Sequence, residues 1–139
     1  SRGLDWVDWS QVDDATQARI IEALIIQKMN AYRANAGLPE LVVSDTVTTD
    51  ARAWSKHMSD SDDFSHDPDY KYFGAGKLDG GDTTYAGENI AYGQRTPQAV
   101  MNGWMNSSGH RANILNASYT QIGVGYVADG HYWTQMFTG

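Results

Sequence analysis

The side chains with the widest chemical scope in this chain are histidines and acids, because the sequence contains no cysteine. Without a thiol there is no thiolate nucleophile, no Cys-ligated zinc and no disulfide framework. Of the four histidines, His57 is expected within a helix and His131 at a hairpin turn, where both are ordinary surface or edge residues. His66 and His110 each follow Gly, Ser or Asp at the boundary of an element, where side chains can converge on a cleft.

Glu88 is an isolated acid in the segment Gly-Glu-Asn-Ile-Ala (residues 87–91), which leads into an apolar strand. Burying a carboxyl group without a partner is costly, so a cation or hydrogen-bond donors are expected beside it. Three polar residues near the same motifs, Asn89, Asn113 and Gln135, are expected to satisfy loop backbone groups rather than to perform chemistry.

The common catalytic and nucleotide-binding motifs are absent. There is no nucleophile elbow, no phosphate-binding loop, no dinucleotide fingerprint and no HExxH helix. The Gly-Val-Gly segment at 123–125 lies inside a predicted strand, where it is expected to allow close backbone packing. Ser65, His66 and Asp67 have the residue types of a catalytic triad, but neighbours in sequence rarely face one another as triad members do. The acidic segment 60–69 departs from the EF-hand template, so a solvated acidic loop is expected, with a weak calcium site as the alternative.

The elements that must position these residues are helices followed by a hairpin. Apolar residues at three- and four-residue steps predict a helix over 14–36, capped by Asp14 or Thr16. Ser44 is expected to cap a second helix after a short extended segment at 41–43. An irregular loop follows from about residue 59 to 85, then a strand over 87–92.

The rest of the chain completes an α+β pattern. Thr96 and Pro97 predict the start of a third helix, and residues 108–115 predict a small fourth one. Strands at 121–128 and 131–138 flank the dipeptide Asp129-Gly130, which is typical of a type I′ hairpin turn. Helices packed on a small antiparallel sheet are therefore expected.

Aromatic residues suggest a second kind of site. Trp6 and Trp9 are expected to pin an N-terminal arm, residues 1–13, to the body of the protein. Five further rings bracket the long loop and either pack it down or line a groove for a sugar or lipid: Tyr70, Tyr72, Phe73, Tyr85 and Tyr92.

Size and charge remove several classes of partner. The 139 residues suit one domain, expected over 14–139, and the net charge of −7 comes without a basic stripe. Binding to nucleic acid or to anionic lipid surfaces needs clustered Lys and Arg, so neither is expected. No apolar run approaches the ~20 residues that span a bilayer, so a membrane-embedded body is excluded as well.

Five blocks of the sequence resemble the CAP superfamily of cysteine-rich secretory proteins, antigen 5 and pathogenesis-related proteins, also called the SCP-like extracellular domain. The blocks occur in the family's order and most closely resemble bacterial members that lack cysteine. They are the segments 30–39 (with Asn-Ala-Tyr-Arg), 64–66 (Phe-Ser-His), 87–90 (Gly-Glu-Asn-Ile), 104–114 (with Ser-Gly-His-Arg-Ala-Asn-Ile) and 122–135.

The resemblance implies a three-layer α-β-α sandwich, an extracellular location and a central cleft. Carried over to this sequence, the cleft residues are His66, Glu88 and His110. Animal members have a second cavity glutamate three residues after a tryptophan, but here that position is Ser107.

The carried-over residues form the His₂Glu donor set of a zinc site with a fourth position open to water. Copper and nickel suit the same ligands, so the donor set does not choose among these metals. The alternative is a His–Glu–His hydrogen-bond cluster that holds no metal. Hydrolysis would need a general base, and Ser107 is a poor replacement for a carboxylate in that role.

The expected function is therefore a secreted or cell-surface binding or interaction domain, monomeric, with no catalytic residue assigned. Two other functions remain open at this point. One is a metal-dependent hydrolase of peptide or cell-wall material, and the other is a carrier for a sterol or other lipid.

Overall fold

The computed structural model describes residues 8–68 and 86–139. A 3₁₀ turn, η2 (Trp9–Gln11), precedes four helices: α1 (Asp14–Asn35), α2 (Asp45–Ser61), α3 (Pro97–Met105) and α4 (Ser108–Ile114). The strands are β1 (Val42–Val43), β2 (Ala86–Tyr92), β3 (Gln121–Val127) and β4 (Tyr132–Thr138). The predicted helices and strands are confirmed, with boundaries that differ by one residue.

Capping side chains explain where three of the helices begin. The Ser44 hydroxyl accepts a hydrogen bond from Val47 N, and the Thr96 hydroxyl accepts one from Ala99 N. The cap of α1 is Asp13, not Asp14 or Thr16 as predicted, because the Asp13 carboxylate accepts from the backbone N of Thr16 at 2.7 Å. Each cap satisfies a backbone donor that has no partner within the helix.

The four strands form one sheet in the order β1-β3-β4-β2. Both pairs that involve β4 are antiparallel, whereas β1 pairs with β3 in parallel through two residues. The expected small antiparallel sheet is therefore present, and the short β1–β3 pair adds a parallel edge to it. The parallel pair arises because the chain crosses from β1 through α2 and the rest of the fold before it returns as β3.

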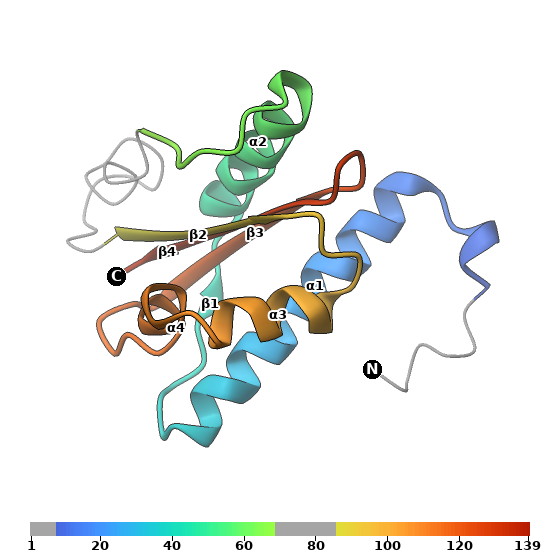
Figure 1. The fold of residues 1–139 in the computed structure, drawn as a ribbon. Coiled ribbons are helices and arrows are strands. Elements are labelled where there is room, and N and C mark those ends of the chain that lie inside the picture. The colour runs from blue at the N-terminus through green and yellow to red at the C-terminus, as the bar shows by residue number, and fades with distance from the viewer. Residues whose placement is uncertain (1–7, 69–85) are drawn as a thin grey trace.

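The helices cover both faces of this sheet in three layers (Figure 1). Helix α2 packs against β3 and β4 on one face, while α1, α3 and α4 cover the other. The larger core lies on the second face and includes Ile25 of α1, Trp104 of α3 and Ile114 of α4. The three-layer α-β-α sandwich is confirmed.

Close packing of α2 on β3 depends on two glycines of that strand. A Cβ atom at Gly123 would collide with the backbone of Val47, and one at Gly125 would collide with the backbone of Ala51. The helix therefore lies directly on the strand, as predicted for these positions.

The β3–β4 turn differs from the predicted type I′ hairpin. Four residues, 128–131, separate the paired Val127 and Tyr132, and the positive φ angles fall at Gly130 (82°) and His131 (53°) rather than at Asp129. A type I′ turn requires positive φ at both of its central residues. His131 is held in this conformation by a 2.7 Å hydrogen bond between its Nδ1 and the Tyr126 hydroxyl.

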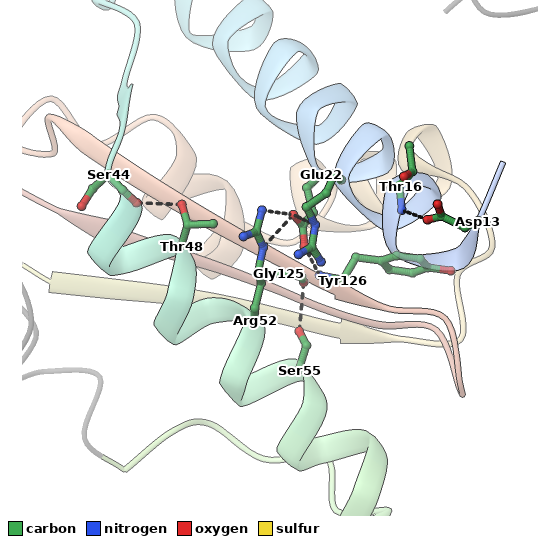
Figure 2. A network of polar contacts seen from close by, with 10 residues as sticks. Asp13, Thr16, Glu22, Ser44, Thr48, Arg52, Ser55, Gly125 and Tyr126 are labelled. Carbon is green, nitrogen blue, oxygen red and sulfur yellow. Dashed lines mark hydrogen bonds and ion pairs between the residues drawn. The ribbon is translucent and has the colours of Figure 1, made fainter.

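A buried acid of α1, Glu22, joins both helical layers to the sheet (Figure 2). Its Oε1 accepts two hydrogen bonds from Arg52 of α2, at 2.8 and 3.0 Å, and Arg19 contributes a second guanidinium. Its Oε2 accepts from Tyr126 N at 3.0 Å. Because β1 covers only the first two residues of β3, this contact satisfies a donor on the uncovered edge of the strand.

No helix within the described residues combines the length and apolarity needed to cross a membrane.

Candidate functional site

The three predicted site residues come from three separate elements and border one pocket of about 280 Å³. His66 lies in the extended segment after α2, Glu88 in the edge strand β2, and His110 in the first turn of α4. Ser107, Gly109 and Asn113 complete its wall.

Glu88 and His66 are directly hydrogen-bonded. Glu88 Oε1 lies 2.6 Å from His66 Nδ1 and also accepts from Asp67 N at 3.1 Å. The Glu88 side chain is fully buried, whereas 55% of the His66 side chain is exposed. The pair therefore reaches from the interior to the surface of the pocket.

The second carboxyl oxygen of Glu88, Oε2, is buried and has no hydrogen-bond partner among the described residues. Burial raises the pKa of Glu88 to about 8; the hydrogen bond from Asp67 N lowers it in part, and the charges of Asp67 and Asp50 raise it further. The carboxyl group is therefore largely protonated at neutral pH. Glu22 forms a contrast, because two guanidinium groups and a backbone donor compensate its burial.

His110 is held by a second oxygen. Its Nδ1 lies 2.9 Å from the hydroxyl of Ser107, the N-cap residue of α4, whose side chain makes no capping bond to the helix. Burial lowers the pKa of His110, and the nearby His66 lowers it further. His110 is therefore a neutral imidazole at physiological pH and can donate a lone pair from one ring nitrogen.

The two imidazoles share one arrangement. In each ring Nδ1 contacts an oxygen, Glu88 Oε1 for His66 and Ser107 Oγ for His110. Where the oxygen accepts from Nδ1–H, the lone pair of the ring is on Nε2, which is the usual arrangement of metal-ligating histidines. From the sequence, Ser107 was regarded only as a lost carboxylate, although the helix predicted from residue 108 already places Ser107 three positions before His110.

Asparagine side chains fix α4 against β2 and so set the position of His110. Asn113 donates to the carbonyl of Glu88 at 3.2 Å, and Asn89 donates to the carbonyl of His110 at 3.1 Å. These backbone bonds were expected, but they join a strand to a helix rather than satisfying loops. Gln135 differs from the prediction, because it accepts from the Asn89 side chain at 3.1 Å.

Two imidazoles and a carboxyl group are suitable donors for a transition metal, but their placement decides which of them can bind one ion. Within residues 8–68 and 86–139, no three His, Cys, Asp or Glu side chains are grouped as a metal ion would require. The two nitrogens of an imidazole point to opposite sides of the ring, so a carboxylate bonded at Nδ1 cannot bind the same ion as Nε2. The His₂Glu ligand set stays a prediction.

The other predicted features fall partly outside the described residues, among them Trp6 and four of the loop aromatics, Tyr70, Tyr72, Phe73 and Tyr85. In the acidic segment, Asp60 pairs with Lys56 and Asp62 accepts from the Tyr132 hydroxyl. Two of the carboxylates considered for calcium therefore already have protein partners.

Comparison with known proteins identifies the family. Residues 26–138 match the family described as "CAP: Cysteine-rich secretory protein family". The chain belongs to the CAP family. It is 47% identical over 120 residues to "Uncharacterized protein YkwD" of Bacillus subtilis (strain 168), covering 85% of this chain and 47% of the relative. It is 35% identical over 133 residues to "Uncharacterized membrane protein YlbC" of the same organism, covering 93% and 36%.

Solved structures share the CAP fold of this chain. An extracellular protein with an SCP domain from Bacillus anthracis superimposes with a TM-score of 0.78 at 32% identity, covering 89% of this chain and 42% of that one. An outer surface protein from Borrelia burgdorferi gives 0.73 at 18% identity, covering 91% and 95%, and shows the fold alone. The CAP domain described above thus spans less than half the length of the two Bacillus subtilis relatives.

Proposed function

We propose that this CAP domain is an extracellular binding domain whose pocket holds a divalent transition-metal ion through the imidazoles of His66 and His110. The observation that carries the proposal is the matched pair of Nδ1 contacts, to Glu88 Oε1 at 2.6 Å and to Ser107 Oγ at 2.9 Å. Both rings border the same pocket of about 280 Å³, and the charge of one ring acts on the pKa of the other.

The chemistry of the donors limits which ion is expected. Neutral imidazole nitrogens suit Zn²⁺, Cu²⁺ and Ni²⁺, whereas Ca²⁺ and Mg²⁺ prefer oxygen. Two protein ligands leave the remaining positions of the ion open to water or to a donor group of a bound molecule. A bound zinc ion would supply Lewis-acid polarisation of such a group.

Glu88 supports this site as the acceptor that orients His66. For Nε2 of His66 to bind a metal, Nδ1 must carry a proton and donate it to an oxygen of Glu88. The alternative role, a third ligand through the unpartnered Oε2, requires the bond between Glu88 and His66 to open. The two roles are separable, because an amide at position 88 can still accept from Nδ1 but is a poor metal ligand.

The extracellular location is proposed from the relatives. The Bacillus anthracis neighbour, 32% identical, is described as an extracellular protein with an SCP domain. Hydrolysis is not part of the proposal. Ser107 stands where animal members have a second glutamate, and its hydroxyl is bonded to His110, so it is a poor general base.

Calorimetric titration with Zn²⁺ tests the metal site. We expect one ion per wild-type chain and a loss of affinity of about 100-fold or more in His110→Ala, which removes one of two ligands. Glu88→Gln is expected to lose about tenfold, the usual cost of weakening an orienting partner. A loss in Glu88→Gln as large as in His110→Ala would instead make Glu88 a direct ligand.

His57→Ala is the matched control, because it removes an exposed imidazole on α2, away from the pocket. Its zinc affinity should equal that of the wild type. Equal heats for wild type and His110→Ala would overturn the proposal.

A further inference from the structure

A second pocket, of about 260 Å³, adjoins the His66–Glu88–His110 pocket and differs from it in character. Ser107 and His110 line both, so the two hollows meet at the start of α4. Each alone is just below the ~300 Å³ at which sites for drug-sized ligands begin, whereas the joined hollow falls within their range.

The floor of this second pocket is apolar and buried. Ile90, Ala91 and Trp104 form it, and each is at most 7% exposed. The Trp104 indole is held in place because its Nε1 donates to the Ile90 carbonyl at 3.1 Å. A preformed apolar floor of this kind favours a flat or bulky apolar group.

Two aromatic rings at the rim are exposed rather than packed. Phe64 is 44% and Tyr92 55% exposed, although their ring centroids are only 4.7 Å apart. Tyr92 also stacks on Tyr132, with centroids 5.9 Å apart, so the rim is supported from behind. Solvent-exposed aromatic clusters beside a cavity mark contact sites for apolar groups.

One polar group in the pocket lacks a partner. Gln94 Oε1 is buried without a hydrogen bond in the part of the chain that the structure describes. The main chain of Gln94 is fixed, because its carbonyl accepts from Trp133 Nε1 at 3.0 Å. A buried carbonyl oxygen with no partner, on a half-buried side chain, suits a ligand that brings an N–H donor.

The geometry points to a subsite for an aromatic residue of a peptide, with its ring on Trp104 between the rim aromatics and its backbone amide donating to Gln94. A sugar fits the pocket less well, because its several hydroxyl groups would need partners and the wall offers few polar groups beyond Gln94, Ser107 and His110. The peptide continues from this subsite toward the His66–Glu88 pair. This inference goes beyond the proposed metal binding and does not require it.

Gly103 of α3 provides a direct way to fill the pocket. It lines the pocket, and a Cβ atom there would meet only the Gln94 side chain, at an ordinary 3.7 Å. Gly103→Leu therefore places a side chain in the pocket without disturbing the backbone. Gly103→Ala is the matched control, because it removes the same helical glycine but adds a single methyl group.

The probe is N-acetyl-4-bromophenylalaninamide, titrated into the full chain in EDTA so that no metal contributes. Its bromine is expected to quench tryptophan fluorescence through Trp104, and calorimetry gives the affinity. We expect Gly103→Leu to weaken binding by about tenfold or more, the usual cost of overfilling a packed space. Gly103→Ala should bind like the wild type, and both should melt at or above the wild-type temperature.

Tyr92→Ala is the second variant and tests the rim at an exposed position. We expect it to weaken binding of the probe by about three- to tenfold. Equal affinity of wild type, Gly103→Leu and Tyr92→Ala would overturn the proposal, as would binding of N-acetylglucosamine in place of the bromophenylalanine probe. Because EDTA is present throughout, failure here leaves the zinc titration unaffected.

Discussion

Replacing Glu88 with Gln tests the protonation state on which the site depends. Burial raises the pKa of Glu88 in the folded protein to about 8, against an ordinary value of 4.5. Between these values the folded chain keeps a proton that the unfolded chain has released. The contribution of this proton to the free energy of unfolding is fully present below pH 4.5 and is lost as the pH rises through 8.

The size of the effect follows from the two pKa values. Each unit of pKa difference corresponds to about 1.4 kcal/mol, so raising the pH from 5 to 8.5 should cost the wild type about 4 kcal/mol of unfolding free energy through this group. Gln has nearly the same shape and does not ionise. The stability of Glu88→Gln relative to wild type should therefore increase by about 4 kcal/mol over the same range.

Urea denaturation in EDTA at pH 5.0, 7.0 and 8.5 measures this difference. A change of 4 kcal/mol corresponds to a relative shift of about 2 M in the urea midpoint. Asp60→Asn is the control, because Asp60 is 64% exposed in a surface pair with Lys56, and its stability relative to wild type should be independent of pH. A stability of Glu88→Gln relative to wild type that stays constant or falls between pH 5.0 and 8.5 would refute the reasoning, because the ionisation of Glu88 would then not be coupled to folding.

Three further predictions concern the packing and the second imidazole. Glu22→Ala should lower the unfolding free energy by about 3 kcal/mol in a urea titration, because it leaves two guanidinium groups and Tyr126 N without their acceptor. A loss below about 0.5 kcal/mol, the size of an ordinary surface change, would show that the network does not stabilise the fold. Gly125→Ala should cost about 1–3 kcal/mol, seen as a lower thermal midpoint by circular dichroism, because its Cβ would meet the backbone of α2; Gly109→Ala, which meets no atom within 4 Å, should not lower it. Ser107→Ala should reduce zinc affinity about tenfold while leaving stability nearly unchanged, because Ser107 holds His110 but makes no capping bond; unchanged affinity would remove Ser107 from the site.

Local interactions made the helices and strands of this chain predictable. Ser44 and Thr96 are recognisable as caps because a hydroxyl before an apolar period has few other uses. Gly123 and Gly125 indicate close packing because glycine is unfavourable in a strand unless something approaches the backbone. In each case the deciding interaction lies within a few residues or leaves a local compositional mark.

The sequence missed details at one helix cap, at the hairpin turn and where distant segments pair. The parallel pairing of β1 with β3 depends on how the chain crosses the sheet, and nothing in Val42 or Val43 specifies it. At the hairpin, the Tyr126 hydroxyl bonds His131 and places the left-handed residue one position later than the dipeptide Asp129-Gly130 suggests.

The resemblance of its motifs to the CAP family selected His66, Glu88 and His110 as candidate site residues without any coordinates. Only the tertiary structure decided how Glu22 and Glu88 differ. Glu22 is buried against two arginines, whereas Glu88 is buried against one imidazole, and its Oε2 has no hydrogen-bond partner among the described residues. The reason is that the charges and hydrogen-bond donors around a buried carboxyl group come from side chains tens of residues away. The free energy of ionising that group depends on these side chains rather than on its neighbours in sequence.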